Sequence, residues 1–167
     1  MTSLREVVSA SVRAVATMAG LLFGVAVPAG LLAGDPATAL TAAGWGLLIG
    51  TTGLWAHETA HLVAARRLAG AGAATVVSSG TTVAVRAPGL EPGHALTVAV
   101  AGPLVGGAAS LLWLAAGAPA WIGCGFAAVH ALNLVPVGGT DGASAWRAVC
   151  RLMVRRWAPR RGVTGGQ

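Results

Sequence analysis

The chain has 167 residues, of which 55% are hydrophobic and only 10% are charged, and its mean hydropathy is +0.73. Soluble domains carry about 25% charged residues, so this composition argues against that class and is typical of a membrane protein. The length leaves room for one compact domain, which we place at residues 1–157 with no appended soluble domain.

Four apolar segments are long enough, at about 1.5 Å per residue, to cross a hydrocarbon layer about 30 Å thick. We predict transmembrane helices at residues 14–33, 39–61, 95–116 and 120–137. The first segment is too long for a removable signal peptide and lacks a convincing cleavage site, so it is predicted to remain as a span. The expected fold class is an all-α polytopic membrane protein.

The net charge of +6 comes from basic residues that are all arginine. They are Arg5, Arg13, Arg66, Arg67, Arg86, Arg147, Arg151, Arg155, Arg156, Arg160 and Arg161. Four spans place all of them on one side, while the opposite connections, residues 34–38 and 117–119, carry only Asp35. This asymmetry predicts a multi-pass protein of the cell membrane with both termini in the cytosol. Because the arginines flank spans, we expect contacts with anionic lipids and no nucleic-acid partner.

Two segments outside the spans have their own patterns. β-branched runs at residues 75–77 and 81–85, separated by residues 78–80, predict a β-hairpin within residues 73–88, between the second and third spans. This hairpin is either a plain connector or an edge for an extended substrate. Residues 143–157 carry arginines at four-residue spacing, which predicts a basic amphipathic helix on the inner membrane surface. Residues 158–167 are predicted to be a disordered basic tail.

The pattern His57-Glu58-Thr59-Ala60-His61 lies at the end of the second predicted span. On a helix, positions four apart differ by about 40° in azimuth, so His57 and His61 share a face and can bind one metal ion. Glu58 can then reach water at that metal and act as a general base. The alternative is a pair of helix histidines whose hydrogen bonds are satisfied without a metal.

A catalytic zinc takes three protein ligands and keeps one position open. Asp141 is the best candidate for the third ligand, because it follows the broken end of the fourth span at a depth similar to that of the histidines. Asp35 lies on the opposite side of the membrane, and Glu6 and Glu91 lie in interfacial segments. Asp141 can also be the N-cap of the helix that follows, and the two roles are compatible.

Several further residues are candidates near this site. The Asn133 amide either forms hydrogen bonds with backbone groups where the helix is interrupted or donates to the oxyanion of a tetrahedral intermediate. Gly102 and Gly106, four apart, allow close helix approach, and we also place them with Asn133 on the substrate side of the site. His130 either contacts a metal ligand without binding the metal itself or is a packing histidine, and we favour packing.

Three motifs follow one another along the chain. They are His57-Glu58-x-x-His61, then Ala101-Gly102-Pro103-Leu104-Val105-Gly106, then Asn133-x-x-Pro136-x-x-x-x-Asp141-Gly142. Over about residues 45–146 this arrangement resembles the site-2 protease family of intramembrane zinc metalloproteases. The resemblance implies one zinc ion per chain, held by His57, His61 and Asp141, with Glu58 as the catalytic glutamate. It also implies a hairpin similar to that family's membrane-associated β element near the substrate path.

The expected function is therefore a zinc endopeptidase that cleaves a transmembrane or membrane-adjacent segment of a single-span membrane protein near the cytosolic face. One alternative is a catalytically silent membrane scaffold of the same fold, which the presence of Glu58 and all three ligands disfavours. The other is a metal transporter, which is disfavoured because the spans carry one polar cluster and no acidic relay. The sequence leaves the oligomeric state open.

Overall fold

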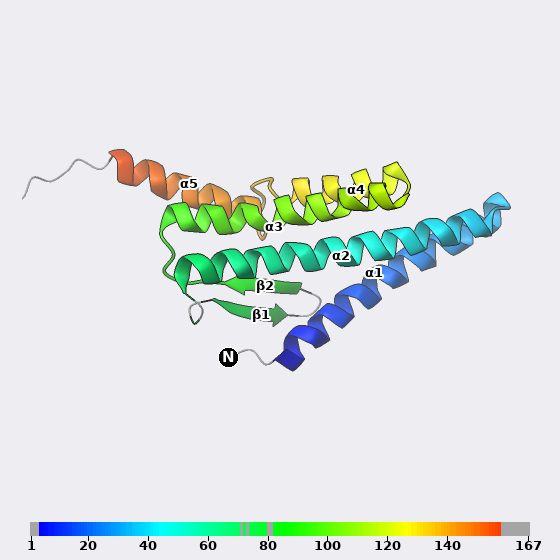
Figure 1. The fold of residues 1–167 in the computed structure, drawn as a ribbon, viewed down its shortest axis with the longest axis horizontal. Helices are drawn as coiled ribbons and strands as arrows, with labels where there is room; N and C mark the ends of the chain where they lie inside the picture. The colour runs from blue at the N-terminus through cyan, green and yellow to red at the C-terminus, as the bar shows by residue number, and fades with distance from the viewer. Residues whose placement is uncertain (1–3, 71, 73, 80–81, 158–167) are drawn as a thin grey trace, which may run out of the picture.

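The structure is a computed structural model that describes residues 4–70, 72, 74–79 and 82–157. Its elements in chain order are α1 (Leu4–Ala33), α2 (Pro36–Ala69), β1 (Thr75–Ser79), β2 (Thr82–Arg86), α3 (Pro92–Leu112), the 3₁₀ helix η1 (Trp113–Ala116), α4 (Ala120–Leu132) and α5 (Asp141–Trp157) (Figure 1). The predicted tail at residues 158–167 lies outside the described residues.

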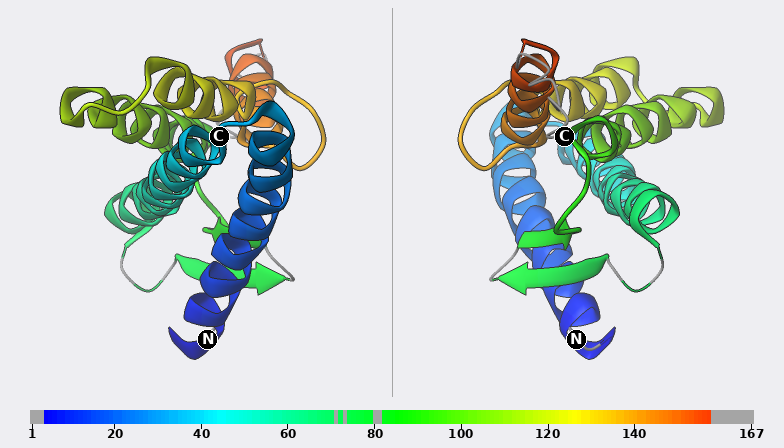
Figure 2. Two further views of the ribbon diagram at one scale, coloured as in Figure 1. Left: turned by 90° about the vertical axis from the view of Figure 1, so that its right-hand side faces the viewer. Right: turned by 90° about the vertical axis from the view of Figure 1, so that its left-hand side faces the viewer.

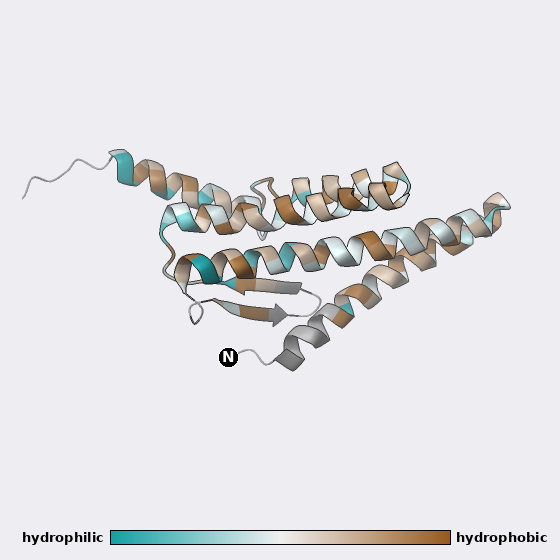
Figure 3. Ribbon diagram, viewed as in Figure 1, coloured by the Kyte–Doolittle hydropathy of each residue, from teal (hydrophilic) through white to brown (hydrophobic). Residues whose placement is uncertain are grey.

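Within this described part, three helical segments are long and apolar enough to cross a membrane. They are Val12–Ala33 in α1, Pro36–Ala69 in α2, and Pro92–Ala116 in α3 and η1. Their positions agree with the first three predicted spans. Large apolar side chains such as Leu21, Leu32 and Leu112 are exposed on them, as expected for helices surrounded by lipid. Hydrophobic residues recur along the whole length of these helices (Figure 3). The chain therefore has the composition and helix lengths of a membrane protein.

The fourth predicted span, residues 120–137, is not a full span in the structure. α4 has 13 residues, so it is about 20 Å long and too short for a hydrocarbon layer about 30 Å thick. The chain then leaves the helix around Pro136, which lacks a backbone N–H, and Gly139, whose φ is +88°. α4 and α5 both contact α3 and lie end to end along it (Figure 1). α4 therefore covers only the first part of the predicted span, and the helix predicted separately at residues 143–157 lies within α5.

The turn between α1 and α2 shows how the sequence ends one helix and begins the next. Gly34 has a φ of +75°, which favours glycine, and the carboxylate of Asp35 accepts a hydrogen bond from the Thr38 N–H over 3.1 Å. Pro36 then occupies the first position of α2, where its missing N–H costs nothing. This turn lies at one end of the molecule, far from the arginine-rich last turns of α2 and α5 (Figure 3).

A small apolar core holds α2 against η1 and α4 near the same end. Ile49 is fully buried and is in contact with Ala118 and Ile122. The rings of Trp45 and Trp113 meet edge to face with centroids 6.2 Å apart. These contacts fix the start of α4, from which it runs back toward the middle of the molecule.

The predicted hairpin between the second and third spans is present as two antiparallel strands, with Val77 opposite Ala84. It lies beside α1 and α2, near the N-terminal end of α1 (Figures 1 and 2). One detail of the prediction was wrong: Ser78 and Ser79 belong to β1 rather than to the turn. The hairpin therefore reaches the end of α2 that carries the histidines.

Candidate metal centre

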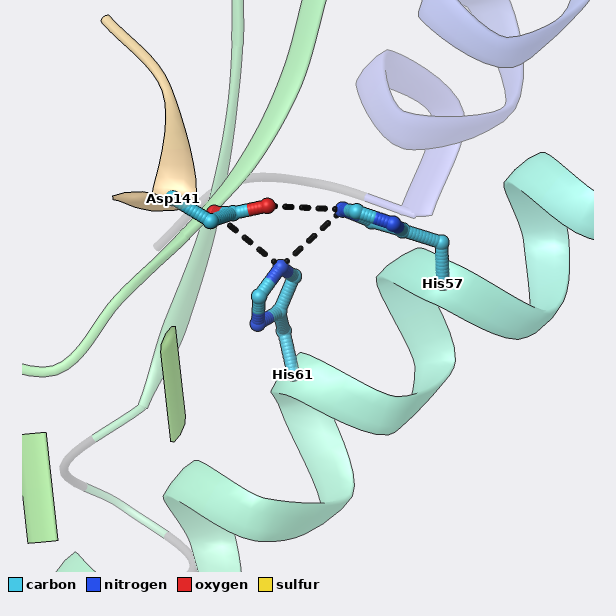
Figure 4. A group of neighbouring side chains, drawn as sticks. All are labelled: His57, His61 and Asp141. Carbon is cyan, nitrogen blue, oxygen red and sulfur yellow. Dashed lines mark hydrogen bonds and ion pairs between the residues drawn. The ribbon is translucent and has the colours of Figure 1, made fainter. Parts of the chain in front are cut away.

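His57 and His61 lie one turn apart on the same face of α2, and both are buried, with 5% and 6% exposure. Their Nε2 atoms are 3.1 Å apart. Asp141, the first residue of α5, places Oδ2 3.1 Å from His57 Nε2 and Oδ1 3.2 Å from His61 Nε2 (Figure 4). The three residues that the sequence singled out therefore converge on one point, and together they can hold a metal ion.

These separations fit a metal ion. Zinc bound by nitrogen and oxygen ligands at about 2.0–2.1 Å in a tetrahedron would place those ligands about 3.3 Å apart. The three separations, 3.1, 3.1 and 3.2 Å, are close to that edge length. Two imidazoles and a carboxylate leave a fourth position open, although the same donors also suit other divalent metals.

The charge of Asp141 matches a cation at this point. Burial raises the pKa of Asp141, but hydrogen bonds with His57 and His61 outweigh burial and lower the pKa to about 2. The carboxylate is therefore ionised at neutral pH.

A backbone carbonyl of α3 fixes the orientation of the His61 ring. Its Nδ1 lies 2.7 Å from the backbone carbonyl oxygen of Val98, a contact in which Nδ1–H donates and Nε2 keeps its lone pair for a metal. A Cβ at Gly102 would collide with the His61 ring. Gly102 thus allows α3 to approach the ligand closely, in line with the expected packing role.

His57 is oriented by a different element. Its Nδ1 lies 3.2 Å from Nδ1 of His130, in the last turn of α4. His130 thus packs against His57, as expected from the sequence, and also places a ring nitrogen against this candidate ligand.

The segment between α4 and α5 holds Asp141 in place. The side-chain amide of Asn133 donates to Asp141 Oδ2 over 2.6 Å, and the Gly142 N–H donates to the Asn133 carbonyl over 2.9 Å. A Cβ at Gly142 would collide with the Leu134 backbone, which explains the glycine after Asp141. Asn133 therefore faces the site and contacts Asp141, while its predicted oxyanion role stays a prediction.

The predicted N-cap role of Asp141 was wrong. The Ala143 N–H donates to Thr140 Oγ1 over 3.2 Å, so Thr140 caps α5. Because Thr140 satisfies this N–H, the Asp141 carboxylate is free to point at the histidines.

Glu58 lies beside the three ligands, with Oε1 4.0 Å from His57 Nε2 and a side chain that is 24% exposed. It lines a cavity of about 440 Å³ together with His57, His61 and Asp141. Ala84 and Val85 of β2 line the same cavity, so the hairpin borders the site. A second cavity of about 350 Å³ shares His57 and Glu58 and extends toward α4.

Other candidate residues lie elsewhere. Asp35 is in the α1–α2 turn, and Glu91 forms an exposed ion pair with Arg155 over 3.8 Å at the start of α3. The Glu6 side chain lies outside the described residues. The three atoms nearest to a Cβ added at Gly106 all belong to His130, and none belongs to a candidate ligand. Comparisons with protein-family models, with curated proteins and with solved structures find no match to this chain.

Proposed function

We propose that this chain is an intramembrane zinc metalloendopeptidase of the site-2 protease family. It would cleave a transmembrane or membrane-adjacent segment of a single-span membrane protein near the cytosolic face. The observation that carries the proposal is the convergence of His57, His61 and Asp141 within 4.8 Å, with Glu58 beside them on a cavity. The order and spacing of the three sequence motifs support the same family.

Zinc in this site would supply a Lewis acid that polarises a peptide carbonyl and lowers the pKa of water to about 7. The Glu58 carboxylate takes a proton from the attacking water molecule while the water oxygen forms a bond to the carbonyl carbon. Glu58 then delivers that proton to the leaving amine as the C–N bond breaks. His57, His61 and Asp141 would hold the metal, while the contacts of Val98 with His61 and of Asn133 with Asp141 fix the direction of two of these side chains.

The substrate must be extended at the cleavage point, because a helix shields its own peptide bonds. β2 pairs with β1 along one edge, and its residues Ala84 and Val85 line the cavity that contains Glu58. A substrate strand added to β2 would gain backbone hydrogen bonds and lie beside the proposed base.

The arginines orient the molecule in the membrane. Arg147, Arg151 and Arg155 recur at four-residue spacing on α5, and Trp146 and Trp157 are exposed on the same helix. Tryptophan and arginine together favour the membrane–water interface, and arginine attracts anionic lipid headgroups. We therefore place α5 on the cytosolic surface, with both chain termini in the cytosol.

The test compares cells that produce the wild-type chain, Glu58→Gln or Glu91→Gln, with quantitative mapping of new N-termini in membrane proteins. Glu91 is the matched control, because its exposed carboxylate lies outside both cavities that contain Glu58. We expect a single-span protein to be cleaved with wild type and Glu91→Gln and to accumulate intact with Glu58→Gln. Identical N-termini in all three cell lines would contradict the proposal.

A further inference from the structure

His130 occupies an unusual place for a residue with no assigned role. It lies in the last turn of α4, and its ring stacks on that of His57 with centroids 5.2 Å apart and planes 28° apart. The shortest link between them joins the two Nδ1 atoms over 3.2 Å. This is a polar contact between ring nitrogens as well as a packing contact.

Two glycines make room for the His130 ring. A Cβ at Gly106 of α3 would lie 2.7 Å from Cε1, 2.8 Å from Nδ1 and 3.0 Å from Nε2 of His130. A Cβ at Gly53 of α2 would lie 2.9 Å from Nε2. Real Cβ atoms are almost never this close to other atoms, so the ring fits between α2 and α3 only because both positions are glycine. The space between Gly53 and Gly106, which we call the slot, therefore fixes the position of the His130 ring.

The proton positions on His57 give this contact a direction. A histidine that binds a metal through Nε2 keeps its proton on Nδ1, and that N–H needs an acceptor. His57 is 5% exposed, so an unpaired Nδ1–H there would be buried without compensation. His130 Nδ1 is the acceptor that the described structure provides, when His130 carries its own proton on Nε2.

We propose that His130 is a positioning residue that accepts the His57 Nδ1–H and so aims His57 Nε2 at the metal. This inference rests on the proposed metal site. The two histidine ligands are then oriented in different ways, His61 by the backbone carbonyl of Val98 and His57 by a side chain. The side chain can be replaced without altering the ligands themselves.

Replacing His130 tests the hydrogen bond directly. His130→Leu fills the slot but accepts no hydrogen bond, whereas His130→Asn places an amide oxygen two bonds from Cβ, as Nδ1 is in histidine. We expect zinc affinity to fall about 10–100-fold in His130→Leu and to stay close to wild type in His130→Asn. Affinity is measured by competition with a chromophoric chelator, and the visible spectrum of the cobalt form reports the ligand geometry.

Two neighbouring glycines supply a matched pair of variants. Gly106→Ala would push the His130 ring out of its slot, whereas a Cβ at Gly107 meets His130 Cβ at an ordinary 3.7 Å. Both changes raise helix propensity by about 1 kcal/mol, so a difference between them reports the ring contact. We expect Gly106→Ala to lose zinc affinity and Gly107→Ala to keep it.

The outcomes separate this inference from the proposed function. If wild type binds zinc and His130→Leu binds it equally well, or if His130→Asn is as weak as His130→Leu, the positioning role is wrong. If His130→Leu does not fold, equal affinities of Gly106→Ala and Gly107→Ala contradict it instead. A wild-type chain without zinc would overturn the proposed function and this inference with it.

Discussion

The Asn133 side-chain amide donates a hydrogen bond to Asp141 Oδ2 over 2.6 Å and so links the end of α4 to the start of α5. The same oxygen lies 3.1 Å from His57 Nε2. The break between the two half-helices is therefore closed by a contact that also orients a candidate metal ligand.

Asn133→Ala should weaken metal binding without removing a ligand. The substitution leaves the Asp141 carboxylate without its amide donor, and loss of such a partner typically costs about 10–100-fold in metal affinity. Chelator competition on purified protein measures the change. His94→Ala is the control, because His94 is exposed in the first turn of α3 and lines neither cavity at the site. Equal affinities in both variants would contradict this account of Asn133.

Gly102→Ala should displace His61. A methyl group at this position would collide with the His61 imidazole, so the ring or the whole of α3 must move. We expect purified Gly102→Ala to retain less zinc than wild type, even though alanine favours the helix by about 1 kcal/mol. Gly93→Ala lies on the same helix in open space and should retain zinc fully. Full zinc retention in Gly102→Ala would show that the close approach of α3 is not needed.

Thr140→Ala should destabilise the fold. The hydroxyl caps α5 by accepting the Ala143 N–H and lies 2.7 Å from the carbonyl oxygens of Val135 and Val137. Loss of such a cap costs about 1 kcal/mol in the free energy of unfolding. Denaturant unfolding in detergent measures the loss, and Thr140→Ser should keep most of the stability. If Thr140→Ala were as stable as wild type, another residue would have to cap α5.

Much of the site followed from local spacing. Positions His57 and His61 share a helix face in any regular helix, and Asp141 follows glycine and proline residues that end a helix. The length of α4 did not follow, because Leu134, Val135 and Val137 continue the apolar pattern beyond the last helical residue. Hydropathy alone therefore could not show that the fourth span is a half-helix.

Two features depended on the packing of distant segments. Thr140 and Asp141 are both good N-cap residues, and the contact of Asp141 with α2 decides which of them caps α5. The pairing of His130 with His57 depends on how α4 approaches α2. A sequence signal existed in the glycines Gly53 and Gly106, which lie inside helices where no turn requires them.

The topology can be tested with reporter fusions. The arginine distribution predicts that Arg67 and Arg161 lie on the cytosolic side of the membrane and that Asp35 lies outside. Fusions after Arg67 and after Arg161 should both report the cytosol, and a fusion after Asp35 should report the outside. An external signal after Arg67 would invert the molecule and place the histidines at the wrong membrane face.

The central claim is that His57, His61 and Asp141 together hold one metal ion, and the zinc-to-protein ratio of purified variants tests it most directly. We expect a ratio near one for wild type and for the acidic controls Asp35→Ala and Glu91→Ala, which alter carboxylates away from the site. Asp141→Ala should lose most of its zinc, because two histidines on one helix bind zinc weakly without a third ligand. Full occupancy in Asp141→Ala, with loss in Glu91→Ala, would contradict the proposed ligand set.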